Sequence, residues 1–488
     1  MHLAAALRSR LVNSLAKHLI SEIQSGGVEP QSLAITGIDD PAGTLRAFSD
    51  AASDPDLAPA LEHWIPALLT SAQPLQGTRA LQRLATLLRE AGTPIDLARA
   101  PIVPALLGAS AVLARRLLAH PDWIEDVAEP LPAAPATAPI PADPAEIRRQ
   151  KYRGLLRIAA RDLASRPFVE SLSELSILAD RCLVAGLECA QEEVGGKPPA
   201  LLALGKLGGR ELNFSSDVDL VFVYSLAEVD DPGSEAQRIA RLVQRLKTTL
   251  EQPSEEGFGY RVDLDLRPEG RAGVVANPIE AALGYYESFG AEWERQALIR
   301  LRPIAGDLPV GEALVRGLRP FVFRKLIGPD VMSDVRDMKH RIETERRDAG
   351  RDIDACVKEG PGGIRDVEFL VQAFQLLHGG HHPELRTGNV IEALTLLAEL
   401  SLLPEFVADA LREAYLWLRR AEHALQLAEE QQTSRIPRDA AGQLGLARRM
   451  GYADEHGDVA RASFNDDWIA VRAEVRAHFD ALVLGETQ

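Results

Sequence analysis

Two short apolar runs joined by a glycine-rich turn constrain the fold of this chain more than any other feature. Residues 202–224 read LALGKLGGRELNFSSDVDLVFVY. The runs 201–204 and 217–224 have the length and composition of buried strands. Three glycines lie in the turn between them: Gly205, Gly208 and Gly209. Because glycine lets a backbone turn tightly and approach a ligand closely, the pattern predicts two strands joined over a ligand-binding turn.

Two aspartates, Asp217 and Asp219, stand at the start of the second run. Residues two apart in a strand point to the same face, so their carboxylates are expected side by side. Mg2+ binds one or two carboxylates together with substrate phosphates, and paired ions can clamp the oxygens of a phosphoryl transfer. The pair therefore predicts a nucleotidyl-transfer site. The alternative is an ordinary strand with solvated acidic ends, because similar acidic triplets recur at 263–265 and 352–354.

A third carboxylate is expected from the alternating segment 257–268. One face of this segment carries four charged residues: Arg261, Asp263, Asp265 and Arg267. Valine and leucine occupy the other face, which is typical of a half-buried strand. If this strand pairs with that of Asp217, Asp263 completes the acidic site. A solvated face with Asp–Arg ion pairs is the alternative.

Size and composition narrow the class of protein. A chain of 488 residues is expected to form roughly two to four domains, and its few aromatics and many Ala, Leu, Arg and Glu residues predict mainly helical structure. The net charge of −17 argues against nucleic acid as the main partner, since that binding needs a basic face. Three cysteines are too few for a disulfide framework, and neither a membrane-spanning run nor a secretory signal is found. A cytoplasmic protein without a membrane partner is expected.

Helical patterns flank the central stretch on both sides. Residues 1–128 are predicted to form an N-terminal helical region, and the Ala/Pro-rich segment 129–145 an extended linker. A catalytic domain is predicted over 146–319 and a C-terminal helical bundle over 320–488. Individual helices are predicted at 147–164, 168–193, 234–251, 331–349, 390–403, 404–432 and 458–484. The predicted fold class is α+β, predominantly helical, with a small mixed sheet.

A second glycine-rich segment, GPGGIRDVEF at 360–369, is predicted to begin a helix. Arg365 at this helix start suits an anion, and Glu368 lies one turn further on. Both are therefore candidates for a role near a nucleotide. The histidine-rich sequence HGGHH at 378–382 resembles a metal cluster, but it has no carboxylate or cysteine at ligand spacing, which favours a loop.

Four segments resemble the glutamine-synthetase adenylyltransferase family, whose members add adenylyl groups to glutamine synthetase and remove them. The segments are GKLGGRELNFSSDVDL (205–220), RVDLDLRPEGRAG (261–273), YYESFGAEWERQALIRLRPIAGD (285–307) and GPGGIRDVEFLVQ (360–372). They occur in family order, and the first also resembles the wider polymerase-beta-type nucleotidyltransferase superfamily. The resemblance implies a small polymerase-beta-type sheet between an N-terminal helical region and a C-terminal bundle.

Members of this family carry two nucleotidyltransferase halves, whereas this chain has one motif set. The lead-in 213–216 resembles the amino-terminal, adenylyl-removing half, so a C-terminal adenylyltransferase half is expected to be missing. The implied reaction is phosphorolysis of the adenylyl-tyrosine of glutamine synthetase by inorganic phosphate, which gives ADP and the unmodified synthetase. Two alternatives stay open: adenylylation of the synthetase with ATP, and a non-catalytic module that docks a PII-type signal protein.

The resemblance also implies roles for individual residues. Asp217, Asp219 and Asp263 are expected to be catalytic and to bind Mg2+ or Mn2+, with Asp265 as the alternative third ligand. The candidates for binding the nucleotide and its phosphates are Gly205, Lys206, Gly208, Gly209, Arg210, Ser215, Ser216 and Arg365. Further candidates near the nucleotide are Asp265, Arg267 and Glu368.

Overall fold

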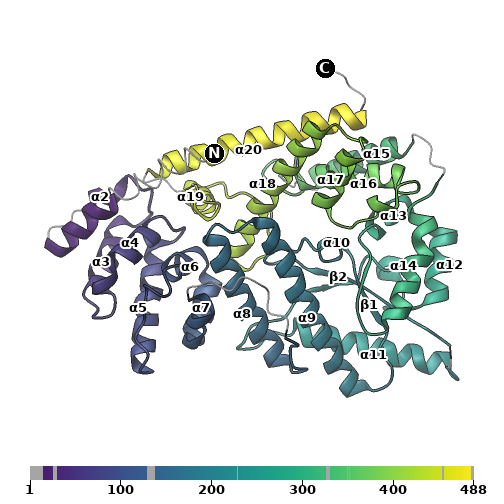
Figure 1. The fold of residues 1–488 in the computed structure, drawn as a ribbon, viewed down its shortest axis with the longest axis horizontal. Coiled ribbons are helices and arrows are strands. Elements are labelled where there is room, and N and C mark those ends of the chain that lie inside the picture. Colours follow the sequence, from purple (N-terminus) through teal and green to yellow (C-terminus); the bar gives the residue numbers. More distant parts are fainter. Residues whose placement is uncertain are drawn as a thin grey trace.

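Helices surround one small mixed sheet in this protein, as Figure 1 shows. The computed structural model of the chain describes residues 15–25, 30–128, 138–227, 229–325, 330–348, 350, 352–452 and 456–484. The predicted α+β class with mainly helical content is confirmed. None of the described helices is both long enough and apolar enough to cross a membrane.

The N-terminal region consists of short helices that bury leucine-rich faces against one another. Their bounds are α2 (Gln31–Ala34), α3 (Pro41–Ala52), α4 (Leu61–Leu69), α5 (Pro74–Glu90), α6 (Val103–Ala109) and α7 (Ala111–Ala119). Asp40 accepts a hydrogen bond from Gly43 N at the start of α3, and such a cap satisfies an otherwise unpaired backbone amide. Residues 129–137 of the predicted linker lie outside the described residues, and the next helix begins at Pro144.

The sheet is built around strand β1 (Ala200–Ala203), which pairs antiparallel with β2 (Val218–Tyr224) and with β5 (Arg302–Ala305). Strands β3 (Val262–Asp263) and β4 (Asn277–Pro278) are both parallel to β2. The predicted strand over 257–268 is therefore wrong in length, because only Val262 and Asp263 pair with β2. The chain turns away directly afterwards, where Asp265 N donates to the Asp263 carboxylate at 2.7 Å.

Side chains of β1 and β2 alternate between two helical layers, as the pleat of a strand requires. Leu201, Leu220 and Phe222 pack in the core that includes α8 (Pro144–Leu163), α9 (Phe168–Val194) and α11 (Pro232–Glu251). Leu202 and Val221 pack in a second core with α12 (Ile279–Phe289), α13 (Glu292–Leu298) and α14 (Leu308–Val322). Both faces of the sheet are covered, so its open edges and loops remain for a site.

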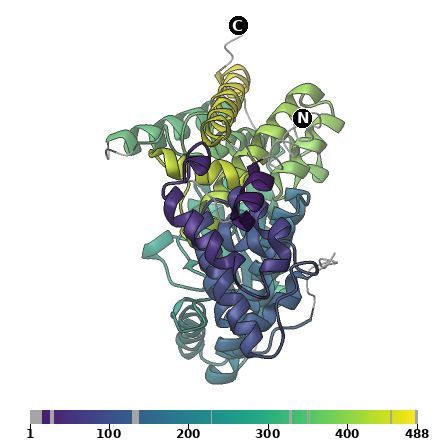
Figure 2. The ribbon, with the colours of Figure 1, turned by 90° about the vertical axis from the view of Figure 1, so that its left-hand side faces the viewer.

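The C-terminal bundle has its own apolar core between residues 357 and 479. Its helices are α15 (Asp330–Asp348), α16 (Ile364–His378), α17 (Val390–Glu399), α18 (Glu405–Glu429), α19 (Ala440–Arg449) and α20 (Gly457–Phe479). The HGGHH segment forms the loop after α16, as predicted. In Figure 2 the purple N-terminal helices lie below the yellow helix α20. Helix α18 reaches from the bundle toward the glycine turn (Figure 1).

Candidate active site

Three acidic residues converge where β2 and β3 pair. Asp219 and Asp263 are direct partners in the parallel register, and Asp217 immediately precedes β2. Burial, and then the neighbouring carboxylates of Asp263 and Asp217, raise the pKa of Asp219 to about 6. Mutual repulsion of this kind is typical of carboxylates that share one site. The structure therefore brings the three predicted carboxylates together.

The first glycine of the turn lies directly against Asp219. Gly205 begins the single-turn helix α10 (Gly205–Gly208) and has a φ of +53°, in the left-handed region. A β carbon at this position would lie 2.0 Å from Oδ2 of Asp219. Leu204 N also donates to the backbone oxygen of Asp219 at 2.9 Å. Only glycine permits so close an approach of the turn to the carboxylate.

The other two glycines are explained by packing of the backbone. A β carbon at Gly208 would lie 2.0 Å from the carbonyl oxygen of Arg300, and one at Gly209 would lie 2.6 Å from that of Gly388. The turn thus fits tightly against the start of β5 and against a loop of the bundle. Arg210, which follows, is exposed and has a φ of +56°.

Both oxygens of the Asp217 carboxylate have partners. Arg261 Nε donates to Oδ1 at 2.6 Å, and Gln432 Nε2 donates to Oδ2 at 2.6 Å. Arg261 also donates to the backbone oxygen of Ser215. Asp217 is therefore oriented from two sides, and one side belongs to the segment that follows α18.

The two charged residues that follow Asp263, Asp265 and Arg267, have partners of their own beside the cleft. Asp265 forms an ion pair of 2.7 Å with Arg271 near the surface, and this guanidinium lowers the pKa of the Asp265 carboxyl. Arg267 is buried and donates to backbone carbonyls, including that of Leu264 at 2.7 Å. Asp263, in register with Asp219, is thus the carboxylate of this segment that faces the acidic site.

A cleft of about 490 Å³ opens beside Asp217 and Asp263, and Asp219 is not among its lining residues. Its polar lining consists of Asp217, Gln244, Lys247, Arg261, Asp263, Asp265, Arg267 and Arg271. The volume suits a small-molecule ligand, and the mixture of cations and carboxylates suits one that carries both phosphates and bound cations.

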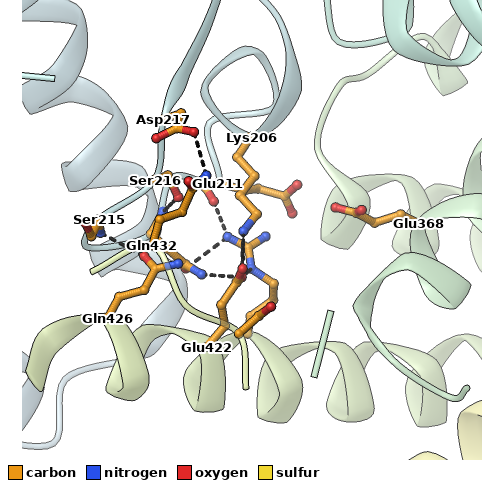
Figure 3. Close-up of polar contacts among 12 residues, drawn as sticks. Lys206, Glu211, Ser215, Ser216, Asp217, Glu368, Glu422, Gln426 and Gln432 are labelled. Atoms are coloured by element: carbon orange, nitrogen blue, oxygen red, sulfur yellow. Dashed lines mark hydrogen bonds and ion pairs between the residues drawn. The ribbon is translucent and has the colours of Figure 1, made fainter. Parts of the chain in front are cut away.

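Lys206 is not among the residues that line this cleft, and its side chain extends toward α18. Its Nζ donates to both carboxylate oxygens of Glu422, at 2.7 and 2.6 Å, as Figure 3 shows. Burial lowers the pKa of Lys206 to about 8, against the opposing effect of Glu422. The ammonium of this predicted phosphate-binding residue is thus engaged in an ion pair.

The two predicted serines also have partners within the chain. Ser215 N donates to Gln426 at 2.8 Å, and the Ser215 hydroxyl donates to the backbone oxygen of Glu430 at 2.8 Å. The Ser216 hydroxyl accepts from Asn213 N at 3.2 Å. These contacts fix the loop that leads into Asp217.

Arg365 and Glu368, on α16, do not line the cleft. Arg365 lies 3.7 Å from Glu359. Glu368 accepts a hydrogen bond of 3.0 Å from Arg300, and it stands apart from the serines in Figure 3. Although burial opposes the effect, Arg300 and its neighbouring cations lower the pKa of Glu368 to about 2. Glu368 thus belongs to a buried network of charges.

The sequence interpretation missed the contribution of α18 to the site. The residues concerned are Arg419, Glu422, Gln426 and, after the helix, Gln432. They lie about two hundred positions from their partners, so no local pattern could pair them with the glycine turn. The one available signal was the run of polar residues at helical spacing, 419, 422 and 426, on a face that is otherwise apolar.

The donor set fits a divalent cation in its chemistry. Asp219 and Asp263 place two carboxylates side by side, and a cation would relieve the repulsion that raises the pKa of Asp219. Within the described ranges, no group of three or more His, Cys, Asp and Glu side chains already has metal-binding geometry. Each oxygen of Asp217 already accepts one hydrogen bond, so a cation would share this carboxylate with Arg261 and Gln432.

Two families of known proteins match separate parts of the chain. Residues 102–316 match the family described as "Glutamate-ammonia ligase adenylyltransferase". Residues 336–483 match the family described as "GlnD PII-uridylyltransferase". The first match contains the sheet and the three carboxylates, and the second contains the bundle helices α16–α20.

Similar full-length proteins carry the name "Bifunctional glutamine synthetase adenylyltransferase/adenylyl-removing enzyme". One from Thioalkalivibrio sulfidiphilus is 42% identical over 352 residues, which are 68% of this chain and 35% of the relative. One from Stenotrophomonas maltophilia strain K279a is 39% identical over 432 residues, 84% of this chain and 45% of the relative. One from Nitrosococcus oceani is 39% identical over 355 residues, which are 69% of this chain and 36% of the relative. The chain spans less than half of the length of each of these relatives.

The small mixed sheet and the glycine turn against an acidic strand both lie within the matched segment, and the class of protein that this segment resembles is the nucleotidyltransferases. Through residues 102–316 the chain belongs to the glutamate–ammonia ligase adenylyltransferase family.

Proposed function

We propose that this chain removes adenylyl groups from glutamine synthetase by phosphorolysis. An oxygen of inorganic phosphate attacks the phosphorus of the adenylyl-tyrosine, and the bond from that phosphorus to the tyrosine oxygen breaks. The products are ADP and the unmodified tyrosine. The observation that carries the proposal is the acidic edge of Asp217, Asp219 and Asp263 beside Gly205, in a chain whose relatives are named for both activities.

The three carboxylates are proposed to hold Mg2+ or Mn2+, which would neutralise the charge of the two phosphate groups that must meet. Asp219 and Asp263 are adjacent for this purpose, while Arg261 and Gln432 keep Asp217 oriented. The tyrosine oxygen is a fair leaving group because its pKa is about 10.

Positive charge in the cleft is proposed to hold the phosphates of the nucleotide. Lys247, Arg261 and Arg271 line the cleft together with Asp217 and Asp263. The turn 205–209 lies close to Asp219 and would bring its backbone near a phosphate bound there. Ser215 and Ser216 are proposed to shape the loop that leads into Asp217.

An assay of both reaction directions tests the proposal. Adenylylated glutamine synthetase with phosphate and Mg2+ should release ADP, and Asp219→Asn should abolish the release. Unmodified synthetase with labelled ATP should gain no label. Label on the synthetase, with no ADP released in the first assay, would instead support the ATP-dependent adenylyltransferase as the function of this chain.

A second candidate function rests on the bundle. Residues 336–483 match a family described by its PII-uridylyltransferase activity, so a PII-type signal protein is a proposed partner of these helices. If docking were the whole function, calorimetry would detect binding of that protein but no binding of Mg2+ with ADP. Binding of Mg2+ with ADP that Asp219→Asn removes would support the catalytic role.

A further inference from the structure

The loop that leads into Asp217 lies along α18, and several of its side-chain contacts come from that helix or from the segment directly after it (Figure 3). Arg261, Ser176 and Val390 contact the same loop from other elements. Apart from the contact of Glu422 with Lys206, the contacts follow the two segments in parallel order: Arg419 with Glu211 and Asn213, Glu422 with Asn213, Gln426 with Ser215, and Gln432 with Asp217. One helix of the bundle therefore contacts this loop at several points between the glycine turn and β2.

The ion pair between Lys206 and Glu422 is the buried centre of these contacts. The Lys206 side chain is 12% exposed and the Glu422 side chain 3% exposed. Asn213 Nδ2 donates to the same carboxylate, so Glu422 contacts both ends of the segment 206–213. Removing one partner of such a pair leaves the other charge buried without compensation, which is strongly unfavourable.

The pair also determines how the turn meets the acidic site. Lys206 directly follows Gly205, whose backbone leaves no room for even a β carbon beside the Asp219 carboxylate. A small shift of Lys206 would therefore move the turn into Asp219 or away from it. Displacements of about 1 Å in an active site can lower a rate by roughly 100-fold.

We propose that Glu422 is a positioning residue of the nucleotidyl site: by binding Lys206 and Asn213 it holds the glycine turn against Asp219, and Lys206 serves this contact rather than the phosphates. The inference rests on the proposed function and assigns its site a residue from the C-terminal bundle. The competing assignment, in which Lys206 binds phosphate, requires the ammonium to leave Glu422 and to cross toward the cleft.

A double-mutant cycle separates the two assignments. Lys206→Met, Glu422→Met and the double variant are compared with the unmodified chain in phosphorolysis of adenylylated glutamine synthetase. Positioning predicts that each single variant lowers kcat by about 10- to 100-fold, keeps the KM for phosphate within about twofold, and is not made worse by the second substitution. A raised KM for phosphate in Lys206→Met, with an unchanged KM in Glu422→Met and additive losses in the double variant, would overturn the inference.

Amide hydrogen exchange on the same variants, without substrate, provides a readout that does not depend on activity. Exchange in residues 205–217 should rise in both single variants and rise no further in the double variant. Unchanged exchange in Glu422→Met would overturn the inference even if the chain proved to catalyse another reaction. A chain that releases no ADP but shows the expected exchange would contradict the proposed function alone.

Controls exclude a general loss of structure. Glu405→Met changes an exposed glutamate on the same helix and should leave kcat unchanged. If a single variant fails to fold, the double variant still distinguishes positioning from phosphate binding. It removes both buried charges and keeps side chains of similar size. Its KM for phosphate should remain that of the unmodified chain, and an increase of about tenfold would contradict positioning.

Discussion

At the scale of single residues, the ionisation of Asp219 is the most informative property of the site. Burial and the neighbouring carboxylates raise its pKa from an ordinary 3.8 to about 6. At a pH between these two values, Asp219 is therefore protonated in the folded chain but ionised in the unfolded chain. The charged carboxylate lowers the free energy of unfolding. This destabilisation is absent at a pH below the ordinary pKa and fully present at a pH above the raised pKa.

Asp219→Asn is accordingly expected to stabilise the metal-free chain at neutral pH. The gain should be about 3 kcal/mol at pH 7 and should shrink toward pH 4.5, where Asp219 is already protonated. Urea unfolding at several pH values with a chelator measures the difference. Asp265→Asn is the control, because that exposed carboxyl has a lowered pKa. A gain that does not vary with pH would contradict the assigned ionisation.

Gly205 provides the second test at this scale. Gly205→Ala places a β carbon 2.0 Å from the Asp219 carboxylate at a left-handed φ, so we expect a loss of activity of about 100-fold and a loss of roughly 1–3 kcal/mol in stability. Gly284→Ala is the matched control, since a β carbon there meets nothing within 4 Å. Kinetics and thermal unfolding of both variants check the prediction. Equal effects at the two glycines would contradict it.

The residues of the acidic site could be proposed from sequence because they are close in the chain or lie in a recognisable strand. Asp217 and Asp219 stand two apart, and Asp263 was placed opposite them through an expected strand. The partner of Lys206 could not be proposed, since Glu422 is 216 positions away. The positive charge of Lys206 in the glycine turn suggests phosphate binding, whereas in the structure Lys206 forms an ion pair with Glu422 on α18.

At the scale of elements, α18 carries charged residues that are buried in the contact between bundle and sheet. Arg419 is fully buried, and it donates to Tyr415 at 2.8 Å and to Asn213 at 3.0 Å. Together with Lys206, Arg300, Glu211, Glu368 and Glu422, it forms a network with equal numbers of cations and anions. Such a balanced network tolerates burial only while it is complete.

Arg419→Met should therefore destabilise the chain by about 3–5 kcal/mol, because it leaves Glu211 and Glu422 with one cation fewer. Arg412→Met on the same helix removes a half-exposed ion pair with Asp409, and its effect should stay within about 1 kcal/mol. Denaturant unfolding of both variants measures the difference. Similar values for the two arginines would show that the network is not essential to stability.

The secondary structure of most helices was predicted well, since apolar periodicity and caps are local signals. The helix predicted at 168–193 is α9 (Phe168–Val194), and that predicted at 234–251 lies within α11, whose start Asp231 caps. The strand predicted over 257–268 pairs with β2 as expected but only at 262–263, because alternation in sequence does not reveal where Asp263 caps a turn and ends the pairing.

At the scale of the whole molecule, the C-terminal and N-terminal helices are joined by buried arginines. Arg448 on α19 donates to the backbone oxygen of Thr36 at 2.7 Å and to that of Ser71 at 3.3 Å, and Arg449 donates to that of Ala109 at 2.7 Å. The largest apolar core likewise runs from the N-terminal helices to the sheet. The predicted boundaries at 128, 145 and 319 remain a proposal about sequence units within this continuous packing.

Arg448→Met should loosen the attachment of the N-terminal helices. Loss of charged hydrogen bonds to two buried carbonyls is expected to cost about 2–3 kcal/mol. Hydrogen exchange should rise in residues 30–71, while the strands β1 and β2 keep their protection. Arg461→Met, at a surface ion pair with Asp458, is the control. Uniform loss of protection throughout the chain would indicate instead that the two regions unfold as one unit.

The fate of isotopically labelled inorganic phosphate tests the central claim most directly. Incubated with adenylylated glutamine synthetase, Mg2+ and this chain, the label should appear in the β-phosphate of ADP, and Asp219→Asn should leave it in inorganic phosphate. Release of AMP with all of the label still in inorganic phosphate would contradict the account, because water rather than phosphate would then be the attacking group.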